Sequence, residues 1–184
     1  MSAPSFRFAT FDDVPAVVDL VDSAYRGDRS RQGWCTEADV LDGQRIDADM
    51  LREALSTEGT GVLLLESGGV LTGCCELRRP RDEGPVALGM FAVDPARQDG
   101  GWGRALLAEA ERLARRDWGC DRIELTVIDL RSTLIGWYER RGYRRTGATK
   151  PFPYGDERFG LPRRDDLRFA VMEKVLTATG RPTA

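Results

Sequence analysis

The chain has 184 residues, of which 41 % are hydrophobic and 31 % charged, and its formal net charge is −3. This length predicts one domain that can bury a sizeable core. The acidic balance argues against the basic surface that non-specific nucleic-acid binding needs, and no apolar run approaches membrane-spanning length. We therefore expect neither a nucleic-acid nor a membrane partner.

Cysteine and histidine content limits the chemistry further. The chain has no histidine, which excludes a histidine-based catalytic triad, and its four cysteines (Cys35, Cys74, Cys75 and Cys120) show no metal-ligand spacing. We expect no metal. Free thiols suit a reducing compartment, so the predicted location is the cytoplasm. The adjacent Cys74 and Cys75 are expected on opposite faces of a strand.

Hydrophobic periodicity predicts the first elements in chain order. Alternation around Phe6 and Phe8 indicates a strand, and Asp12 or Asp13 can cap the helix that follows. The pattern lapses into a long loop over 25–45, and Asp47 is expected to cap a second helix.

The remaining elements are predicted from the same signals. A tight turn at 67–69 separates two strands of a hairpin, and Gly142 suits a left-handed helix end after a helix capped by Ser132 or Asp129. The later predicted strands cover 61–66, 70–78, 86–93, 122–128, 143–148 and 167–176. The predicted order is β-α-α-β-β-β-α-β-α-β-β, with one domain over 1–176 and a disordered tail over 177–184.

The stretch 86–116 carries the strongest functional signal. An apolar strand ends at Asp94-Pro95, a glycine-rich turn follows, and a helix with Leu106 and Leu107 on its apolar face begins at once. This order places unpaired backbone N–H groups at a helix N-terminus, where the macrodipole also favours anions. The turn is therefore predicted to bind phosphate.

Three kinds of phosphate loop differ in spacing. A nucleotide-binding P-loop needs lysine and then Ser or Thr after its last glycine, whereas Gly103 precedes Arg104-Ala105. A dinucleotide fingerprint would need a small residue in place of Leu106. The pattern Q-x-x-G-x-G followed by a basic residue fits Gln98, Gly101, Gly103 and Arg104. In this the chain resembles the GNAT superfamily of acyl-CoA-dependent N-acetyltransferases, and the predicted order of elements matches that family over nearly the whole chain.

The resemblance implies an α/β (α+β) fold with a mixed, mostly antiparallel central sheet flanked by helices. It also implies transfer of an acetyl group from acetyl-CoA to a primary amine through a tetrahedral intermediate. The residues expected to hold the pyrophosphate are Gln98, Asp99, Gly100, Gly101, Trp102, Gly103 and Arg104, with added positive charge from Arg97. Asp99 departs from the glycine common in the family, and its side chain is expected to point outward. Main-chain atoms of Phe91 and Val93 are expected to bind pantetheine.

Two catalytic roles follow from the resemblance. The N–H of Val93 is the expected oxyanion donor. In the segment 134–143, Tyr138 takes the place of the helical tyrosine that faces the CoA sulfur. A thiol has a pKa of about 8.5 and tyrosine about 10, so Tyr138 is expected to hydrogen-bond the developing thiolate. Arg131 stands where relatives often have an asparagine.

The general base is less clear from the residues. An amine of pKa about 10.4 cannot pass its proton directly to a carboxylate near pKa 4 without a cost of roughly 8 kcal/mol, so a raised pKa or a water chain is needed. Glu76, on the strand beside the central one, is the first candidate, and Glu37 and Asp39 are the others.

The acceptor is expected between the loops 25–45 and 150–166, against Trp34, Glu37, Phe152 and Tyr154. Acidic residues there would suit a small cation, whereas Arg29, Arg31, Arg158 and Arg163 would suit an acid equally well. The predicted partner is a small-molecule or peptide amine, and a homodimer is left open. Two rival functions remain: a non-catalytic acyl-CoA sensor of the same fold and a dinucleotide-binding protein.

Overall fold

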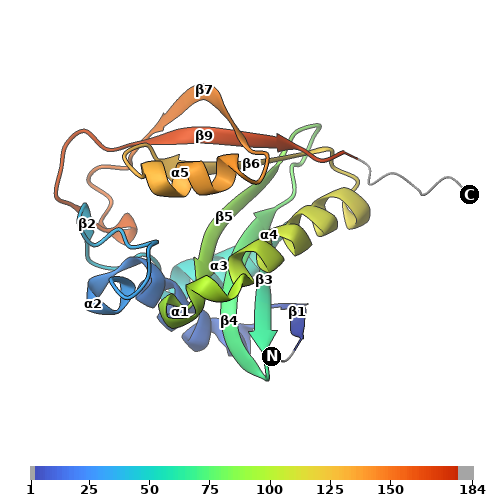
Figure 1. Cartoon of the computed structure of the whole chain (residues 1–184), viewed down its shortest axis with the longest axis horizontal. Helices are drawn as coiled ribbons and strands as arrows, with labels where there is room; N and C mark the ends of the chain where they lie inside the picture. The colour runs from blue at the N-terminus through green and yellow to red at the C-terminus, as the bar shows by residue number, and fades with distance from the viewer. Residues whose placement is uncertain (1–2, 178–184) are drawn as a thin grey trace, which may run out of the picture.

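The computed structural model describes residues 3–177, and the tail predicted to be disordered lies, apart from Thr177, outside the described residues. A seven-stranded sheet in the order β1-β3-β4-β5-β6-β9-β7 dominates the fold (Figure 1). Neighbouring strands are antiparallel except for β5 and β6. This confirms the predicted mixed, mostly antiparallel sheet; the single domain over 1–176 remains a prediction.

The elements follow the predicted order, with short additions in the two long loops. The strands are β1 (Pro4–Phe8), β2 (Leu41–Asp42), β3 (Thr60–Ser67), β4 (Val70–Arg78), β5 (Val86–Val93), β6 (Arg122–Ile128), β7 (Arg144–Pro151), β8 (Leu161–Pro162) and β9 (Arg168–Val175). The α-helices are α1 (Val14–Tyr25), α2 (Gly27–Ser30), α3 (Ala48–Ser56), α4 (Trp102–Arg112) and α5 (Ser132–Glu139). β2 pairs with β8, which ties the two long loops to each other.

Helices cover both faces of the sheet, and each face has its own core. Leu106, Leu107 and Ala110 of α4 pack with Ile135 and Tyr138 of α5 on one face, while α1 and α3 pack on the other. The adjacent cysteines of β4 lie on opposite faces of the sheet, because Cys75 belongs to the first core and Cys74 to the second. Both are buried and unoxidised, and the predicted opposite orientation is confirmed.

The turn between β3 and β4 explains the glycine pair there. Ser67 pairs with Val70, which leaves Gly68 and Gly69 as a two-residue loop with φ of 62° and 76°. Positive φ at both central residues is the requirement of a type I′ turn, which glycine meets without steric cost. The predicted hairpin is confirmed.

The central strand β5 leaves its parallel neighbour part-way along its length. It pairs with β6 only from Val86 to Leu88, against Ile123 to Leu125, and beyond that point the two strands diverge (Figure 1). Its pairing with β4 shifts by one residue between the Ala92 and Gly89 rungs. Met90 has φ +46°, rare for a residue with a side chain. A bulge of this kind bends the strand that carries it, so it accompanies the opening beside β5.

Helix ends show where local signals were misleading. Asp47 caps α3 by accepting from the Met50 amide at 2.8 Å, as predicted. Asp13 instead accepts from the Thr10 amide and pairs with Arg7, so its side chain does not cap α1. Arg131, and neither Ser132 nor Asp129, is the residue before α5. At α1, the ion pair with Arg7 therefore overrode the capping preference of Asp13, and Asp129 near α5 likewise pairs with Arg168.

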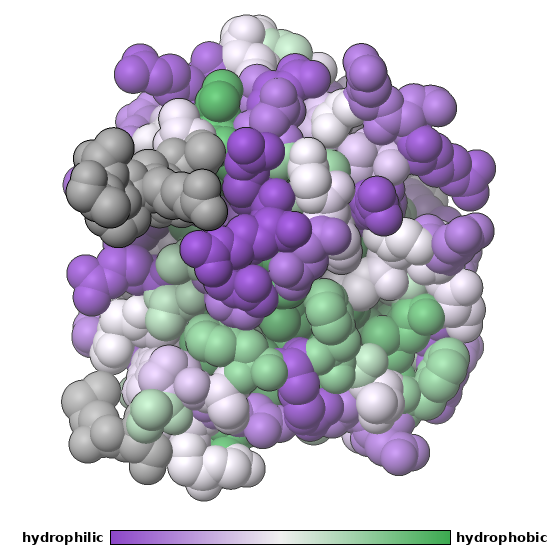
Figure 2. Space-filling view, turned by 90° about the vertical axis from the view of Figure 1, so that its right-hand side faces the viewer, coloured by the Kyte–Doolittle hydropathy of each residue, from purple (hydrophilic) through white to green (hydrophobic). Residues whose placement is uncertain are grey.

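The surface mixes charged and apolar residues. The side shown in Figure 2 has hydrophilic side chains over its upper part and a band of apolar ones below. Among residues 3–177 no helix has the length and apolar character needed to cross a membrane.

Candidate active site

A cleft of about 470 Å³ lies between the end of β5 and α5. One wall is the end of β5 with the turn into α4, and the other is the face of α5. Its lining residues are Tyr25, Trp34, Cys35, Phe91, Val93, Gln98, Asp99, Gly101, Gly103, Arg104, Leu134, Trp137, Tyr138 and Arg141. The structure therefore brings together residues from the glycine-rich turn, the central strand and the helix of Tyr138, as the sequence predicted.

Part of the glycine-rich turn is a short helix whose backbone amides are used within it. Residues Pro95–Gly100 form a 3₁₀ helix (η2), in which amides bond to the carbonyl three residues back. Gly101 then adopts φ +77°, and α4 begins at Trp102. The first-turn amides of Trp102, Gly103 and Arg104 precede the first carbonyl-bonded amide, that of Ala105 to Gly101. The amides of Trp102, Gly103 and Arg104 are therefore available to bind an anion at the start of α4.

Gly103 leaves room where a side chain would intrude. A Cβ added there would lie 3.4 Å from the Trp137 ring, 3.7 Å from Val93 and 3.8 Å from Phe91. The missing side chain therefore keeps open the space between the first turn of α4, the end of β5 and α5. Such a cradle fits a narrow chain like pantetheine lying between a phosphate group and the sheet.

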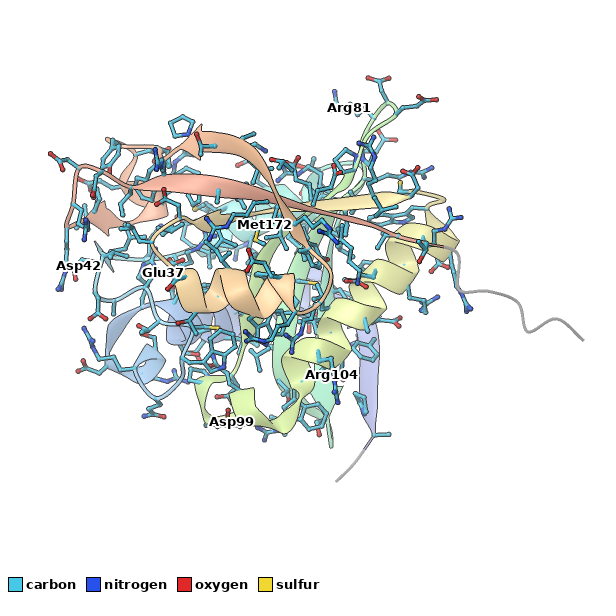
Figure 3. All side chains as sticks on the ribbon, turned by 45° about the horizontal axis from the view of Figure 1, so that its top comes forward. Glu37, Asp42, Arg81, Asp99, Arg104 and Met172 are labelled. Carbon is cyan, nitrogen blue, oxygen red and sulfur yellow. The ribbon has the colours of Figure 1, made fainter. Side chains whose placement is uncertain are left out.

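Two arginines supply positive charge to this end of the cleft. Arg104 stands on the first turn of α4, with Asp99 close by on the turn before it (Figure 3). Arg141 stacks on Trp137 at 3.5 Å, and its Nε is buried without a hydrogen-bond partner. Arg97, expected to help, instead bonds Thr72 and lies beside Asp94. The side chain of Asp99 is exposed, in keeping with the outward orientation predicted.

The backbone of β5 presents alternate groups to the cleft. Asp94 donates to Thr72 of β4 at 2.9 Å, so by antiparallel alternation the main-chain groups of Val93 face away from β4. Two side chains already use the carbonyls: the Tyr25 hydroxyl donates to Phe91 at 2.5 Å and Gln98 Nε2 to Val93 at 3.2 Å. The N–H of Val93 therefore points toward the opening, while the Phe91 N–H lies in the bulge.

Gln98 works as a clamp within the protein. Its side-chain nitrogen donates to the Val93 carbonyl, and its side-chain oxygen accepts from the amide of Trp34 at 2.9 Å. It thereby ties the loop after α2 to the end of β5. This use of both amide atoms leaves its side chain less available to phosphate than the motif suggests.

Tyr138 lies at the deep end of the cleft. It is 4 % exposed and packs edge-on against Trp137, with ring centroids 5.0 Å apart. Burial, together with the nearby Tyr25 and Cys35, raises the pKa of Tyr138 well above its ordinary value. The hydroxyl therefore stays protonated at neutral pH and can donate a hydrogen bond.

A second cavity of about 290 Å³ adjoins the first at Tyr138. The two cavities share the side chains of Tyr25, Phe91, Leu134 and Tyr138. The rest of the second cavity is formed by Arg26, Glu37, Leu41, Arg45, Leu88, Gly89, Met90, Leu125, Thr126, Val127, Ile128, Arg131, Phe152, Pro153, Phe159 and Phe169. Two chambers that meet at one tyrosine suit a reaction between two substrates.

A buried ion cluster forms one wall of the second cavity. Glu37 is bound by Arg26 at 2.6 Å and by Arg131 at 3.1 Å, and it lies beside the start of α5 (Figure 3). Burial alone would raise the pKa of Glu37, but the charges of Arg131, Arg45 and Arg26 outweigh it and lower that pKa. Glu37 is therefore a fixed anion and a poor proton acceptor.

The other predicted acceptor and base residues are divided between the cavities and the surface. Phe152 lines the second cavity, whereas Trp34 lines the first. The Tyr154 hydroxyl accepts from the Leu167 amide, and Tyr154 lines neither cavity. Glu76 pairs with Arg78 at 2.7 Å and also lies outside both. Asp39 pairs with Arg31 on the surface.

Of the arginines that line the cavities, only Arg104 was predicted as a site residue. Arg26, Arg45, Arg131 and Arg141 line them, whereas Arg29, Arg31, Arg158 and Arg163 form exposed ion pairs with neighbouring aspartates. Tyr25, which joins α1 to the Phe91 carbonyl, was also missed. Only Arg131 had a signal, as an unusual residue in the place of a family asparagine.

Comparison with known proteins identifies the family. The model of the acetyltransferase (GNAT) family matches residues 20–143. The chain belongs to this family. A curated relative, an amino-acid acetyltransferase of Actinobacillus pleuropneumoniae, is 25 % identical over 142 residues. That match covers 77 % of this chain but only 28 % of the relative.

Two solved structures agree with this assignment. A putative acetyltransferase from Salmonella typhimurium, solved with its cofactor acetyl-CoA, is 25 % identical, with a TM-score of 0.67 over 100 % of this chain and 99 % of the other. The ribosomal-protein-S18-alanine N-acetyltransferase from Escherichia coli is 17 % identical, with a TM-score of 0.69 over 99 % of both chains. The second shares the fold alone at this identity. These matches support an acetyltransferase and leave its acceptor open.

Proposed function

We propose that this protein transfers an acetyl group from acetyl-CoA to a primary amine. The observation that carries the proposal is a pair of cavities that share Tyr138 in their walls, one reaching the first turn of α4 and the other bounded by β5, β6 and the residues around Glu37. The first would hold the donor and the second the acceptor. Acetyl-CoA supplies the acetyl group as a thioester, which an amine can attack directly.

The first cavity has the groups that the donor needs. The amides of Trp102, Gly103 and Arg104 and the charges of Arg104 and Arg141 would bind the pyrophosphate. The N–H groups of Phe91 and Val93 would bind pantetheine and, at Val93, the carbonyl oxygen as it becomes an oxyanion. The acyl carbon would then lie near Tyr138.

The chemistry needs one bond made and one broken. The amine nitrogen forms the C–N bond, the C–S bond breaks, and the amine loses one proton. Tyr138 would donate a hydrogen bond to the leaving sulfur, because its raised pKa keeps it protonated. Neither Glu76 nor Asp39 lines the cavities and Glu37 is held by arginines, so we propose that the proton leaves to water.

The decisive experiment compares the wild type with Tyr138→Phe in an assay of thiol release from acetyl-CoA with a panel of amines. We expect kcat to fall roughly 10²-fold or more, since positioned proton donors contribute about this much. The affinity for acetyl-CoA, measured by calorimetry, should stay within a few fold. Tight acetyl-CoA binding without turnover of any amine would favour the non-catalytic sensor instead.

A further inference from the structure

The acceptor chamber has an excess of positive charge. Among its lining residues are three arginines, Arg26, Arg45 and Arg131, and one carboxylate, Glu37. Arg26 and Glu37 are 7 % and 8 % exposed, so this charge is held away from bulk water. Uncompensated charge in such a place is costly, and a bound anion would offset it.

The arginines differ in how far their hydrogen-bonding capacity is used. Arg131 donates to Glu37 and to the carbonyl of Cys35 at 2.6 Å. Arg26 also binds Glu37, but its Nε is buried and has no hydrogen-bond partner among residues 3–177. A buried unpaired donor in a cavity wall costs free energy unless a ligand meets it.

Arg45 is the most available cation of the three. Its guanidinium lies 5.5 Å from the centre of the Tyr25 ring, and it forms no ion pair with a carboxylate of residues 3–177. Its charge nevertheless reaches the interior, since it contributes to the lowered pKa of Glu37. Glu37 therefore satisfies the other two arginines first, and Arg45 is left for a ligand.

The remaining walls limit the size and polarity of that ligand. Phe152, Phe159, Phe169 and Leu125 are apolar, and the chamber measures about 290 Å³. This suits one compact molecule with an apolar body. The amine of that molecule has to lie at the junction with the donor cleft, beside Tyr138.

We propose that the acceptor is a compact amine that carries its own carboxylate, as an amino acid does, and that Arg45 with Arg26 binds this carboxylate. The inference rests on the proposed acetyl transfer. It resolves the choice left open by the sequence between a cationic and an acidic acceptor, because the arginines that line the chamber differ from the exposed ones considered there.

The test uses matched acceptors that share one side chain: a free amino acid, its carboxamide and the corresponding decarboxylated amine. With the wild type we expect kcat/KM to be about 10- to 100-fold higher for the free acid, the range for one charge-assisted hydrogen bond. Equal or faster turnover of the neutral analogues would overturn the inference while leaving acetyl transfer intact.

Substitution of Arg45 distinguishes a loss of carboxylate recognition from a general loss of activity. Arg45→Gln should lower kcat/KM for the acid about 10- to 100-fold, leave the decarboxylated amine within about 3-fold and not change KM for acetyl-CoA. Arg45→Lys should recover part of the loss. Arg52→Gln is the matched control, because Arg52 is an exposed arginine of α3 paired with Asp49. Equal losses for acid and amine in Arg45→Gln would contradict the assignment.

A binding measurement tests the carboxylate site even if the protein acetylates none of the amines. Calorimetry with CoA present can compare an N-acetyl amino acid with the N-acetyl amine that lacks its carboxylate. Tighter binding of the acid without turnover of any amine would uphold the anion site and overturn the proposed activity. Equal binding of both would overturn the anion site.

Discussion

Burial decides the chemical role of single residues at this site. Tyr138 keeps its proton because its environment raises its pKa, whereas Glu37 keeps its negative charge because three arginines lower its pKa. Sequence reasoning could propose both residues but not these opposite states. The states depend on neighbours that are far away in the chain, such as Arg131 for Glu37.

Glu37 also predicts how stability depends on pH. A carboxyl whose pKa is lower in the folded than in the unfolded state stabilises the fold fully above its unfolded pKa of about 4.3, and this contribution is lost as pH falls toward the folded value. At pH 7, Glu37→Gln should therefore destabilise the protein by about 3 kcal/mol, because it leaves Arg26 and Arg131 buried without a counter-charge.

The measurement is denaturant unfolding of the wild type and Glu37→Gln between pH 7 and pH 3. The difference between the two should shrink below about pH 4 as the wild-type carboxylate becomes protonated. Asp49→Asn, at the exposed partner of Arg52, is the control and should change stability by less than about 0.5 kcal/mol. A gap between wild type and Glu37→Gln that stays constant with pH would show that charge is not the cause.

At the scale of elements, the turn between β5 and α4 sets the direction of the donor amides. Gly101 has φ +77°, and it is followed at once by the first turn of α4. A Cβ added at position 101 would lie no closer than 3.9 Å to another group, the Arg104 side chain. The position therefore favours glycine because of its backbone conformation and not because of space. A non-glycine residue there would favour a different turn and so redirect the amides after it.

Gly101→Ala should lower the affinity for acetyl-CoA about 10-fold, and it should cost about 1 kcal/mol of stability from backbone strain. Gly119→Ala is a matched control: Gly119 also has positive φ, 69°, with open space around its Cβ, and it lies outside the cleft. It should show the same strain without loss of affinity. Calorimetric titration and thermal unfolding measure the two quantities, and parallel losses of affinity in both variants would argue against the amide cradle.

The bulge in β5 is the second decisive feature at this scale. The strand was predicted with its correct bounds from its apolar run, and β5 indeed spans Val86–Val93. The apolar pattern of the sequence does not indicate the positive φ of Met90 or the register shift beside it. Because the opening beside β6 accompanies this bulge, the cleft could be expected only through the family resemblance.

For the whole molecule, the arrangement of two adjoining cavities predicts which nucleotide ligand stabilises the fold. Acetyl-CoA at 100 times its Kd should stabilise the protein by about 2.7 kcal/mol, which for a chain of this size raises Tm by about 5–10 °C. Thermal unfolding with acetyl-CoA and, separately, with NAD tests this. Stabilisation by NAD alone would favour the dinucleotide-binding alternative.

The sequence by itself determined the order of elements and the place of the glycine-rich turn, whereas the mixed character of the sheet was implied by the family resemblance. The order and the turn follow from local patterns: alternation in strands, helical spacing in α4 and the glycines at 100, 101 and 103. A local pattern indicates which face of an element is buried, and a few consecutive residues are enough to recognise it.

Only the tertiary structure decided which charges meet. Arg26, Arg45 and Arg131 come from three distant parts of the chain, and they gather around one chamber because α1, the following loop and the start of α5 converge there. Arg29 and Arg31 look the same in sequence, yet they form exposed ion pairs with Asp19 and Asp39. Charged side chains carry no periodic signal, so long-range packing alone determines whether an arginine lines the site or the surface.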